Sequence, residues 1–299
     1  MAASGADKGR RDGFALGLSH GYFHGRCAAV MAKYAQEAPL TRNYRILYVR
    51  SGKGYPYSPL DRAIIDSLSE MTEQLATAFP KDDVVGLAAA FKPDAAIVLD
   101  AIGSFPPEKA DALRRLGIKT AVWFTDDPYY TDVTISLAPH YDYVFTMEQS
   151  CVPLYRSIGC GEVHHLPFAV NPRVYHPRKV DLSLRSDICF IGSAFWNRVE
   201  FFDRIAPYLA GKKTLIVGLW WNRLRHYRLL KSKIRLGQWM NPEQTSARYF
   251  GAKIVINMHR SHEDESFNRN SRNIPALSVN PRTFEICGSG AFQLTDVRQ

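Results

Sequence analysis

The segment "AVWFTDDPYYTD" (121–132) passes from four apolar or aromatic residues, through one threonine, into two carboxylates and a proline. A short apolar run is typical of a strand buried in a parallel sheet, and Pro128 cannot continue the hydrogen-bonded ladder. We therefore expect Asp126 and Asp127 at the carboxyl end of a strand, where open α/β sheets bind ligands. The alternative, which the local sequence favours, is that Asp-Asp-Pro only forms a turn.

Strand-like runs alternate with helical stretches on both sides of this segment. The expected strands are 44–49, 95–100, 119–124, 141–146 and 163–167, then 187–192, 214–218, 253–258 and 291–296. The expected helices are 59–79, 107–116, 149–157, 197–209, 242–250 and one that starts at Pro281. This alternation indicates βαβ units around parallel sheets.

The pattern predicts an α/β protein with two Rossmann-like units facing across a cleft. The predicted parts are an N-terminal glycine-repeat helix (1–40), a first Rossmann-like domain (41–170), a proline-bearing linker (171–186) and a second domain (187–299). Four strand candidates in the second unit are fewer than the five or six of common doubly wound nucleotide-binding sheets. We therefore expect the second domain to be partial.

The composition excludes several classes of protein. With 46% hydrophobic and 12% aromatic residues, the 299-residue chain can build cores and is not expected to be disordered. No apolar run approaches the roughly 20 residues that span a bilayer, and we expect no signal peptide. The five cysteines are scattered without a C-x-x-C pair, which predicts reduced thiols and a cytoplasmic location.

The net charge of +9 is confined to the second part of the chain. Residues 1–184 hold 20 basic and 20 acidic side chains, whereas residues 185–299 hold 18 basic and 9 acidic ones. A positive field attracts anions such as a diphosphate, a nucleic acid or an anionic surface, although a solvated basic face is the simpler interpretation. The basic segment 218–235, "GLWWNRLRHYRLLKSKIR", also fits single-stranded nucleic acid or a membrane surface, but we expect its apolar side chains to be buried in the second unit.

The N-terminal segment repeats glycine every four residues, at positions 13, 17, 21 and 25. On a helix these glycines form one bare stripe beside an apolar stripe. Four glycines cost about 3–4 kcal/mol of helix propensity, so we expect another surface to approach them closely. We interpret the segment as a packing or self-association helix.

Two motifs in the second unit suit a phosphate group. In "FIGSAFWNR" (190–198), Gly192 and Ser193 follow a strand and precede a helix, and Arg198 could add a charged contact. An ordinary strand–helix turn explains these residues equally well. In "INMHRS" (256–261), His259 and Arg260 follow another strand, and Arg260 is a phosphate candidate. His259 could be an acid or a phosphate contact, although an ordinary surface histidine is favoured.

The segment "VNPRTFEICGSGAF" (279–292) contains an orderly helix start, with Asn280 as cap and Pro281 at the first position. Arg282 and the free N–H groups there could bind an anion, and Glu285 one turn further could accept hydrogen bonds from a ribose diol. The alternative is a salt bridge for Glu285 and glycines that only end the helix.

Four segments in the same order carry a family resemblance: "AVWFTDDPYYTD", "YDYVFTMEQSCVPLYRSIGC", "DICFIGSAFWNR" and "NPRTFEICGSG". From about Tyr44 to the end, the chain resembles the spore-maturation (CgeB-type) family of GT-B glycosyltransferases. The resemblance implies two Rossmann-like domains with the nucleotide sugar held mainly by the second. Relatives continue past this point, so the resemblance also implies a C-terminally truncated chain.

The resemblance assigns roles to individual residues. Gly192 and Ser193 would contact the donor diphosphate, Glu285 the ribose, and Gly290 would be the glycine that follows this glutamate. Asp126 and Asp127 would stand near the acceptor, with Asp127 as the preferred catalytic base. Many retaining relatives carry a first glutamate eight residues before the second, where this chain has Leu277, so neither stereochemical outcome is implied.

We predict a cytoplasmic hexosyltransferase that moves a sugar from a nucleoside-diphosphate donor to a glycan, protein or small-molecule hydroxyl, in spore-surface or cell-envelope glycan synthesis. Arg198, Arg260 and Arg282 would neutralise the diphosphate, so no metal and no cofactor are expected. The predicted partners include an anionic membrane surface and a second copy of the chain through the N-terminal helix, but no specific nucleic acid. The alternatives are a non-catalytic basic binding or spore-assembly protein and, third, a nucleotide-sugar epimerase.

Overall fold

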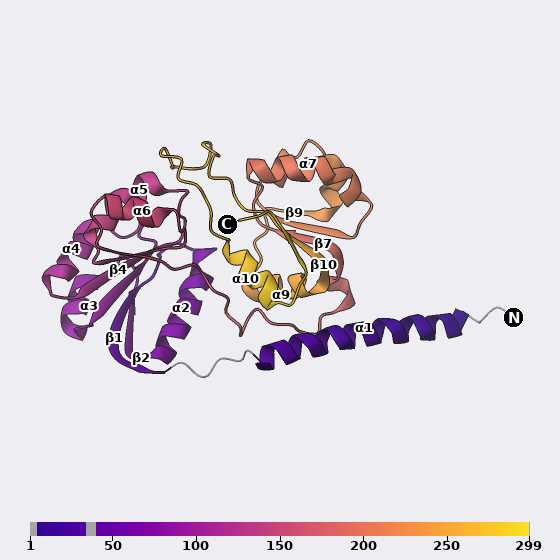
Figure 1. Cartoon of the computed structure of the whole chain (residues 1–299), viewed down its shortest axis with the longest axis horizontal. Helices are drawn as coiled ribbons and strands as arrows, with labels where there is room; N and C mark the ends of the chain where they lie inside the picture. The colour runs from indigo at the N-terminus through magenta and orange to yellow at the C-terminus, as the bar shows by residue number, and fades with distance from the viewer. Residues whose placement is uncertain (1–4, 34–39, 299) are drawn as a thin grey trace.

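The computed structural model describes residues 5–33 and 40–298. Two parallel sheets, each covered by helices, lie side by side (Figure 1). The first sheet has the strand order β2-β1-β3-β4-β5-β6. Its strands are β1 (Arg42–Val49), β2 (Thr72–Ala78), β3 (Ala95–Leu99), β4 (Lys119–Phe124), β5 (Tyr143–Thr146) and β6 (Glu162–His165). Its helices are α2 (Tyr57–Met71), α3 (Val84–Phe91), α4 (Pro107–Arg115), α5 (Thr131–Leu137) and α6 (Cys151–Ser157).

The second sheet has the order β11-β10-β7-β8-β9. Its strands are β7 (Ser186–Ile191), β8 (Thr214–Gly218), β9 (Ile234–Leu236), β10 (Ala252–Asn257) and β11 (Gln293–Thr295). Its helices are α7 (Trp196–Ala210), α8 (Tyr227–Leu230), α9 (Pro242–Gly251) and α10 (Pro281–Gly288). Short 3-10 turns lie at Ala138–His140, Leu182–Leu184, Trp221–Arg223 and Lys231–Lys233.

The apolar run before the two aspartates forms β4, a central strand of the first sheet, as predicted. Val122 and Phe124 are fully buried, and they pack with Val98 and Val144 of the neighbouring strands. Because helices cover both faces, every position of such a strand can be apolar. The chain leaves the sheet directly at Thr125, which brings Asp126 and Asp127 to its carboxyl edge.

Two edge strands were not predicted. The helix expected over 59–79 ends at Met71, and residues Thr72–Ala78 form β2, the edge strand of the first sheet. The second sheet has five strands rather than four, because Ile234–Leu236 pairs with β8 as β9. Both strands lie at edges and are largely exposed, so neither shows the apolar run of a buried strand.

Each sheet has one switch point, where the strand order reverses. It lies between β1 and β3 in the first sheet and between β7 and β10 in the second. Ligands of open α/β sheets bind outside the carboxyl ends of the strands at such points. The loops that follow these four strands therefore define where a site should be sought.

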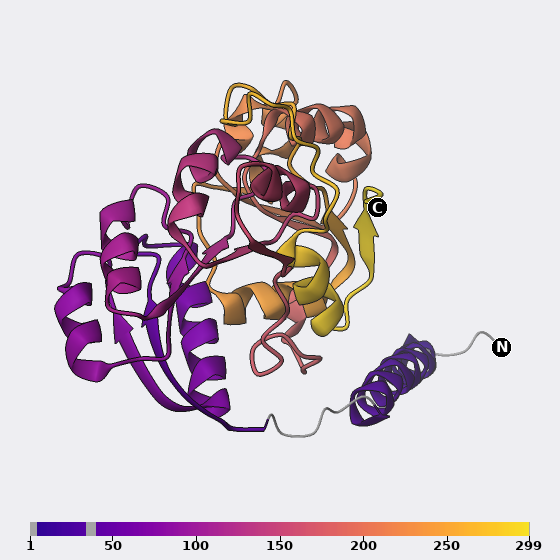
Figure 2. The same ribbon diagram turned by 60° about the vertical axis from the view of Figure 1, so that its left-hand side comes forward.

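A segment of the second unit, residues 258–280, crosses to the first unit and returns; we call it the strap (Figures 1 and 2). Asp132 accepts hydrogen bonds from Ser271, at 3.0 Å from its backbone N–H and 2.7 Å from its hydroxyl. The backbone N–H of Ser278 donates to Glu148 at 3.0 Å. These contacts hold the strap against α5 and the start of α6.

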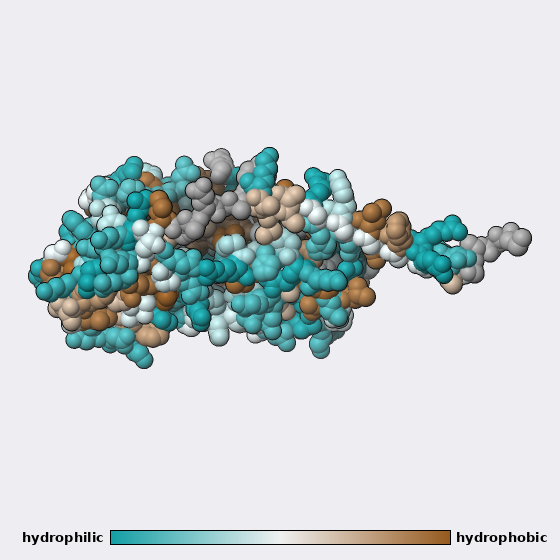
Figure 3. All heavy atoms as spheres, turned by 90° about the horizontal axis from the view of Figure 1, so that it is seen from below, coloured by the Kyte–Doolittle hydropathy of each residue, from teal (hydrophilic) through white to brown (hydrophobic). Residues whose placement is uncertain are grey.

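Helix α1 (Gly5–Lys33) extends along the second unit and projects beyond it (Figure 1). Phe23 and His24 contact the ring of Phe250 on α9. A side chain added at any glycine of this helix would meet no atom within 4 Å, so no part of the described chain approaches the bare stripe. Figure 3 shows hydrophobic surface on the projecting rod. Self-association through α1 stays a prediction.

The segment 218–235 forms short helical turns and β9. Trp221 and Leu224 are buried in the second core, as expected. Leu219 and Leu229 are exposed, contrary to the expectation. In the described part of the chain, no helix combines the length and the apolar character needed to cross a membrane.

Gly218 ends β8 and packs against the loop after β7. A Cβ added there would lie 2.2 Å from the carbonyl oxygen of Gly192, and its φ of 142° disfavours a side chain. Gly218→Ala should lower the free energy of unfolding by at least about 2 kcal/mol, measured by chemical denaturation. Gly161→Ala, whose Cβ would meet nothing within 4 Å, should stay within about 0.5 kcal/mol. Equal losses would contradict this packing.

Candidate functional site

A cavity of about 200 Å³ lies where the two switch points meet. Loops after β1, β3 and β4 of the first unit line it together with one residue that follows β10 of the second. These residues are Lys53, Tyr57, Ile102, Asp126, Tyr130 and Arg260. A carboxylate from one unit and a guanidinium from the other therefore share one cavity.

Asp126 faces this cavity and accepts a hydrogen bond from the Tyr57 hydroxyl. Lys53 forms an ion pair with the buried Asp100 and lies 4.8 Å from the centre of the Tyr57 ring. Burial raises the pKa of Asp100 in spite of Lys53. The first unit thus places a carboxylate, a phenol and an ammonium group around the cavity.

Asp127 points away from the cavity and is only 2% exposed. Its carboxylate accepts hydrogen bonds from the hydroxyls of Thr146 at 2.6 Å and Tyr155 at 2.8 Å. Burial raises the pKa of Asp127 to about 7, although these hydrogen bonds act in the opposite direction. The two adjacent aspartates therefore differ in environment. Asp126 meets the cavity, whereas Asp127 anchors the turn to α5, β5 and α6.

Arg260 joins the two units. Its guanidinium lies 4.4 Å from the ring centre of Tyr129 in the first unit and 4.5 Å from that of Phe195 in the second. The Tyr129 hydroxyl donates to the Arg260 carbonyl oxygen at 3.1 Å, and Arg260 donates from Nη2 to Phe267 at 2.9 Å. Cation–π contacts leave the edge of a guanidinium free for an anion.

Arg198 holds the loop after β7 from within. It is only 3% exposed and donates to the carbonyl oxygens of Met258 and Ser193, both at 2.9 Å. Burial, followed by the positive charges of Arg282 and Arg260, holds the pKa of Arg198 well below its ordinary value. The three predicted arginines therefore converge. Arg198 supports the loop, and Arg260 and Arg282 are the ones with groups left for a ligand.

Gly192 and Arg282 meet at the second switch point. A Cβ added at Gly192 would lie 2.9 Å from a terminal nitrogen of Arg282, so a side chain there would displace this guanidinium. The Trp221 indole N–H donates to the Gly192 carbonyl oxygen at 2.9 Å and fixes the loop. The first turn of α7, directly beyond, offers free N–H groups to an anion.

Glu285 lies one turn into α10, which starts at the predicted cap. The Asn280 side chain accepts from the backbone N–H of Thr283 at 3.2 Å. The Tyr175 phenol lies beside Glu285. Burial raises the pKa of Glu285, and the charge of Arg282 opposes that shift. Helix α10 thus carries the predicted ribose residue and the predicted phosphate residue on the same turns.

The structure does not bring Gly290 to this cluster. Gly290 follows the end of α10 with a φ of 71°, and its added Cβ would meet Pro177 of the linker and Cys27 of α1. The helix separates it from Arg282 at the opposite end. Its local role is therefore to end α10 in a left-handed conformation, which glycine adopts most readily.

Lys53 and Tyr57 were missed because their loop, "SGKGYPYS" (51–58), carries no phosphate or carboxylate motif. A glycine- and proline-rich loop after the first strand of an α/β unit was the available signal. Tyr130 lies within the opening segment and was passed over in favour of the aspartates.

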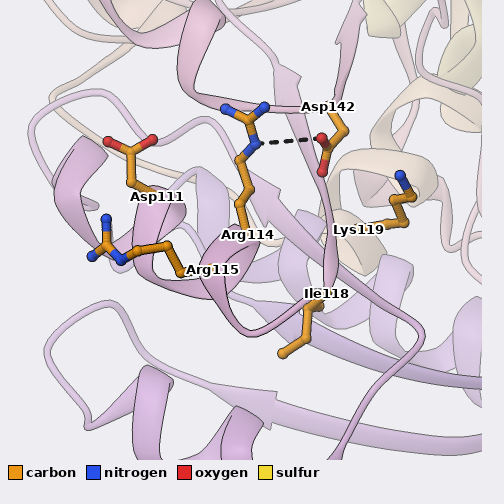
Figure 4. Close-up of a pocket in the computed structure, with 7 residues that line it drawn as sticks. Asp111, Arg114, Arg115, Ile118, Lys119 and Asp142 are labelled. Atoms are coloured by element: carbon orange, nitrogen blue, oxygen red, sulfur yellow. Dashed lines mark ion pairs between the residues drawn. The ribbon is translucent and has the colours of Figure 1, made fainter.

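A second, larger hollow of about 450 Å³ lies at the amino ends of β4 and β5 (Figure 4). Arg114 and Asp142 form an ion pair across it at 3.3 Å. It is at the edge of the sheet opposite to the switch points. Among residues 5–33 and 40–298, no group of three or more His, Cys, Asp or Glu side chains could hold a metal ion.

Comparison with known proteins decides the family. The chain is 30% identical over 259 residues to the spore protein CgeB of Bacillus subtilis (strain 168), which covers 85% of this chain and 80% of that protein. The chain belongs to the CgeB family of GT-B glycosyltransferases. A family model described as glycosyl transferase-like matches residues 198–299 of this CgeB-family chain.

Solved structures agree with the GT-B fold of the CgeB-family chain. An alpha-glucosyltransferase in complex with UDP and a 13-mer DNA matches with a TM-score of 0.58 at 12% identity, covering 85% of this chain and 80% of that one. AviGT4, a glycosyltransferase involved in avilamycin A biosynthesis, matches with a TM-score of 0.52 at 11% identity, covering 84% and 78%. Anabaena Alr3699/HepE in complex with UDP-glucose matches with a TM-score of 0.52 at 10% identity, covering 85% and 80%.

The buried Asp127 makes stability depend on pH. Its pKa rises from 3.8 to about 7 on folding, so the folded chain binds the proton more tightly than the unfolded chain. The resulting stability is fully present below pH 3.8 and is lost as the pH rises through about 7. Asp127→Asn should remove this loss, which is at most about 1.4 kcal/mol per pH unit. Urea unfolding from pH 4.5 to 8 measures it. Asp66→Asn, on the surface of α2, should keep the wild-type slope, and an unchanged slope in Asp127→Asn would refute the buried-acid interpretation.

Proposed function

We propose that the protein transfers a sugar from a nucleoside-diphosphate sugar to a hydroxyl acceptor, with the donor in the second unit and the acceptor beside Asp126. The observation that carries this proposal is the cavity between the switch points, because Asp126 and Arg260 line it from opposite units. Transfer at an anomeric carbon needs a positively charged site for the leaving diphosphate and a base for the incoming alcohol. Membership of the family supports the same chemistry.

On the donor side, Gly192, Ser193, Arg260 and Arg282 would bind the diphosphate, and Glu285 would bind the ribose. Gly192 gives the backbone room, and the guanidinium of Arg282 lies against it. Arg198 would keep this loop in shape through the Ser193 carbonyl oxygen. Fixed arginines and helix N-termini can stabilise the charge of the leaving group, so we propose that the transfer needs no metal and no further cofactor.

On the acceptor side, Asp126 is the base we favour, since it faces the cavity and Asp127 does not. The Tyr57 hydroxyl donates to Asp126 and would orient its carboxylate toward the acceptor. Lys53 keeps a positive charge beside the same ring. Asp127 would act by holding the turn that presents Asp126.

The biological setting is proposed from the relative alone. The name of the spore protein CgeB supports a role in spore-surface or cell-envelope glycan synthesis. A cytoplasmic location, contact with an anionic membrane surface and a homo-oligomer through α1 belong to the same proposal. The basic charge of residues 185–299 supports the membrane contact.

Donor binding is tested with Glu285→Ala. Release of nucleoside diphosphate from a panel of nucleotide sugars, with and without simple sugar acceptors, should identify a donor. Loss of the hydrogen bonds to the ribose should then raise KM for that donor about 10- to 100-fold. Glu200→Ala, on the exposed face of α7, is the control and should keep the wild-type KM. An unchanged KM in Glu285→Ala would refute the donor-site assignment.

The role of Asp126 is tested by Asp126→Asn. Removing a general base should lower kcat about 10²- to 10⁴-fold, while the Kd for UDP stays within about twofold. Asp12→Asn on α1 should leave both unchanged. If kcat is unaltered in Asp126→Asn, Asp126 is not the base. Binding of UDP by wild type without any diphosphate release would favour the non-catalytic alternative.

A further inference from the structure

His259 and Asp296 form a buried pair directly beside Arg260. The His259 Nδ1 lies 2.6 Å from Asp296 Oδ1, and the His259 backbone N–H donates to the same oxygen at 3.0 Å. His259 is only 2% exposed. Two contacts to one carboxylate oxygen fix both the backbone and the orientation of the ring.

The other ring nitrogen, Nε2, is buried and has no hydrogen-bond partner in the described part of the chain. A buried polar atom without a partner is unfavourable by about 1–3 kcal/mol. Natural proteins rarely leave such an atom unless a ligand or water completes it. The free Nε2 is therefore an unsatisfied group in an otherwise well-ordered loop.

The Gly192 loop lies beside His259. Strand β10 lies between β11 and β7, and Asp296 follows β11. Arg198 donates both to Met258, the residue before His259, and to Ser193 in the loop after β7. With Nδ1 held by Asp296, Nε2 is the ring nitrogen left for a ligand in these surroundings. The Asn197 side chain of α7 donates to the His259 carbonyl oxygen at 2.8 Å, so His259 lies against the first turn of that helix.

The start of α10 lies against the end of the same strand. Asn280 donates from its side chain to Asn257, two residues before His259, at 2.8 Å. Two helix N-termini therefore flank His259, and both favour an anion. The charged groups around it are Asp296 and Arg298 from the segment after β11, Arg260 from the strap, Arg198 from α7 and Arg282 from α10.

We propose that His259, oriented by Asp296, binds the nucleoside diphosphate by donating from Nε2 to a phosphate oxygen. This inference rests on the proposed function and adds a diphosphate-binding residue and a positioning residue to it. His259 would stabilise the charge that develops on the leaving diphosphate.

The pair implies that binding takes up a proton. Hydrogen bonds from His259 hold the pKa of Asp296 below its ordinary value, against the opposing effect of burial. Asp296 is thus a carboxylate. In the neutral tautomer that donates to it from Nδ1, His259 would present a lone pair at Nε2. That lone pair repels a phosphate oxygen. A proton taken from solvent onto Nε2 turns the repulsion into a charge-assisted hydrogen bond, with Asp296 on one side of the imidazolium and phosphate on the other.

Calorimetric titration of the full chain with UDP tests this proposal. At pH 8, in two buffers with different heats of ionisation, wild type should take up close to one proton per UDP bound. His259→Gln should take up none and should bind UDP about 10- to 100-fold more weakly. Wild-type affinity should fall as the pH rises from 7.5 to 8.5, a range in which the terminal phosphate of UDP is already ionised, and the affinity of His259→Gln should be flat there.

Asp296→Asn tests the positioning role and keeps the test informative if His259→Gln misfolds. It leaves His259 in place but removes the charge that favours the imidazolium. Proton uptake should therefore shift to lower pH, a change that a merely structural role would not cause. Far-UV circular dichroism and thermal unfolding establish that each variant is folded.

His226→Gln is the matched control, because Asp203 accepts from the His226 backbone N–H at 2.9 Å and lies 3.2 Å from its Nδ1. That pair joins α7 to the residue before α8 and does not line the cavity, so the variant should bind UDP and take up protons like wild type. If folded His259→Gln matches wild type in both affinity and proton uptake, the His259 proposal is overturned and the transferase proposal stands. If wild type binds no UDP, ADP or GDP at any pH, the proposed function itself fails.

Discussion

The contact of Arg260 with Tyr129 and Phe195 is the interaction on which the candidate site depends. The guanidinium lies between aromatic rings of the two units, and its own carbonyl oxygen accepts from the Tyr129 hydroxyl. The other strap contacts hold the units together further along the chain, whereas this one lies at the cavity itself. With it, Asp126 of the first unit and Arg260 of the second face one cavity.

The arginines at this site have different structural roles. Arg198 is buried and donates to backbone carbonyl oxygens. It therefore stabilises the loop after β7 from its buried side. The guanidinium of Arg282 lies against Gly192, where an added Cβ would displace it. The positive charges of Arg198, Arg260 and Arg282 repel one another. Together with burial, this repulsion lowers the pKa of Arg198. An anionic ligand would relieve that repulsion, which is why such a cluster favours a diphosphate.

The sequence predicted features that depend on local signals. The apolar run of β4 and the Asn280–Pro281 helix start needed no knowledge of the rest of the fold. Edge strands were missed, since β2 and β9 are exposed and lack a buried pattern. Which of two neighbouring aspartates meets the cavity was not predictable either, because Asp127 is turned inward by hydroxyls of Thr146 and Tyr155, 19 and 28 residues away along the chain. Lys53 and Tyr57 follow β1, and they lie near Asp126, which follows β4, only because both strands belong to the same parallel sheet.

The strap adds a constraint on how the molecule can move. Residues of the second unit hydrogen-bond to Asp132 and Glu148 of the first, so the units are joined by the linker and by these side chains. A wide hinge opening would have to break these bonds one after another. Relative motion of the two units is therefore restrained both at the linker and at the strap, so a mutation in this loop could change how far the units separate without touching the sugar or the base.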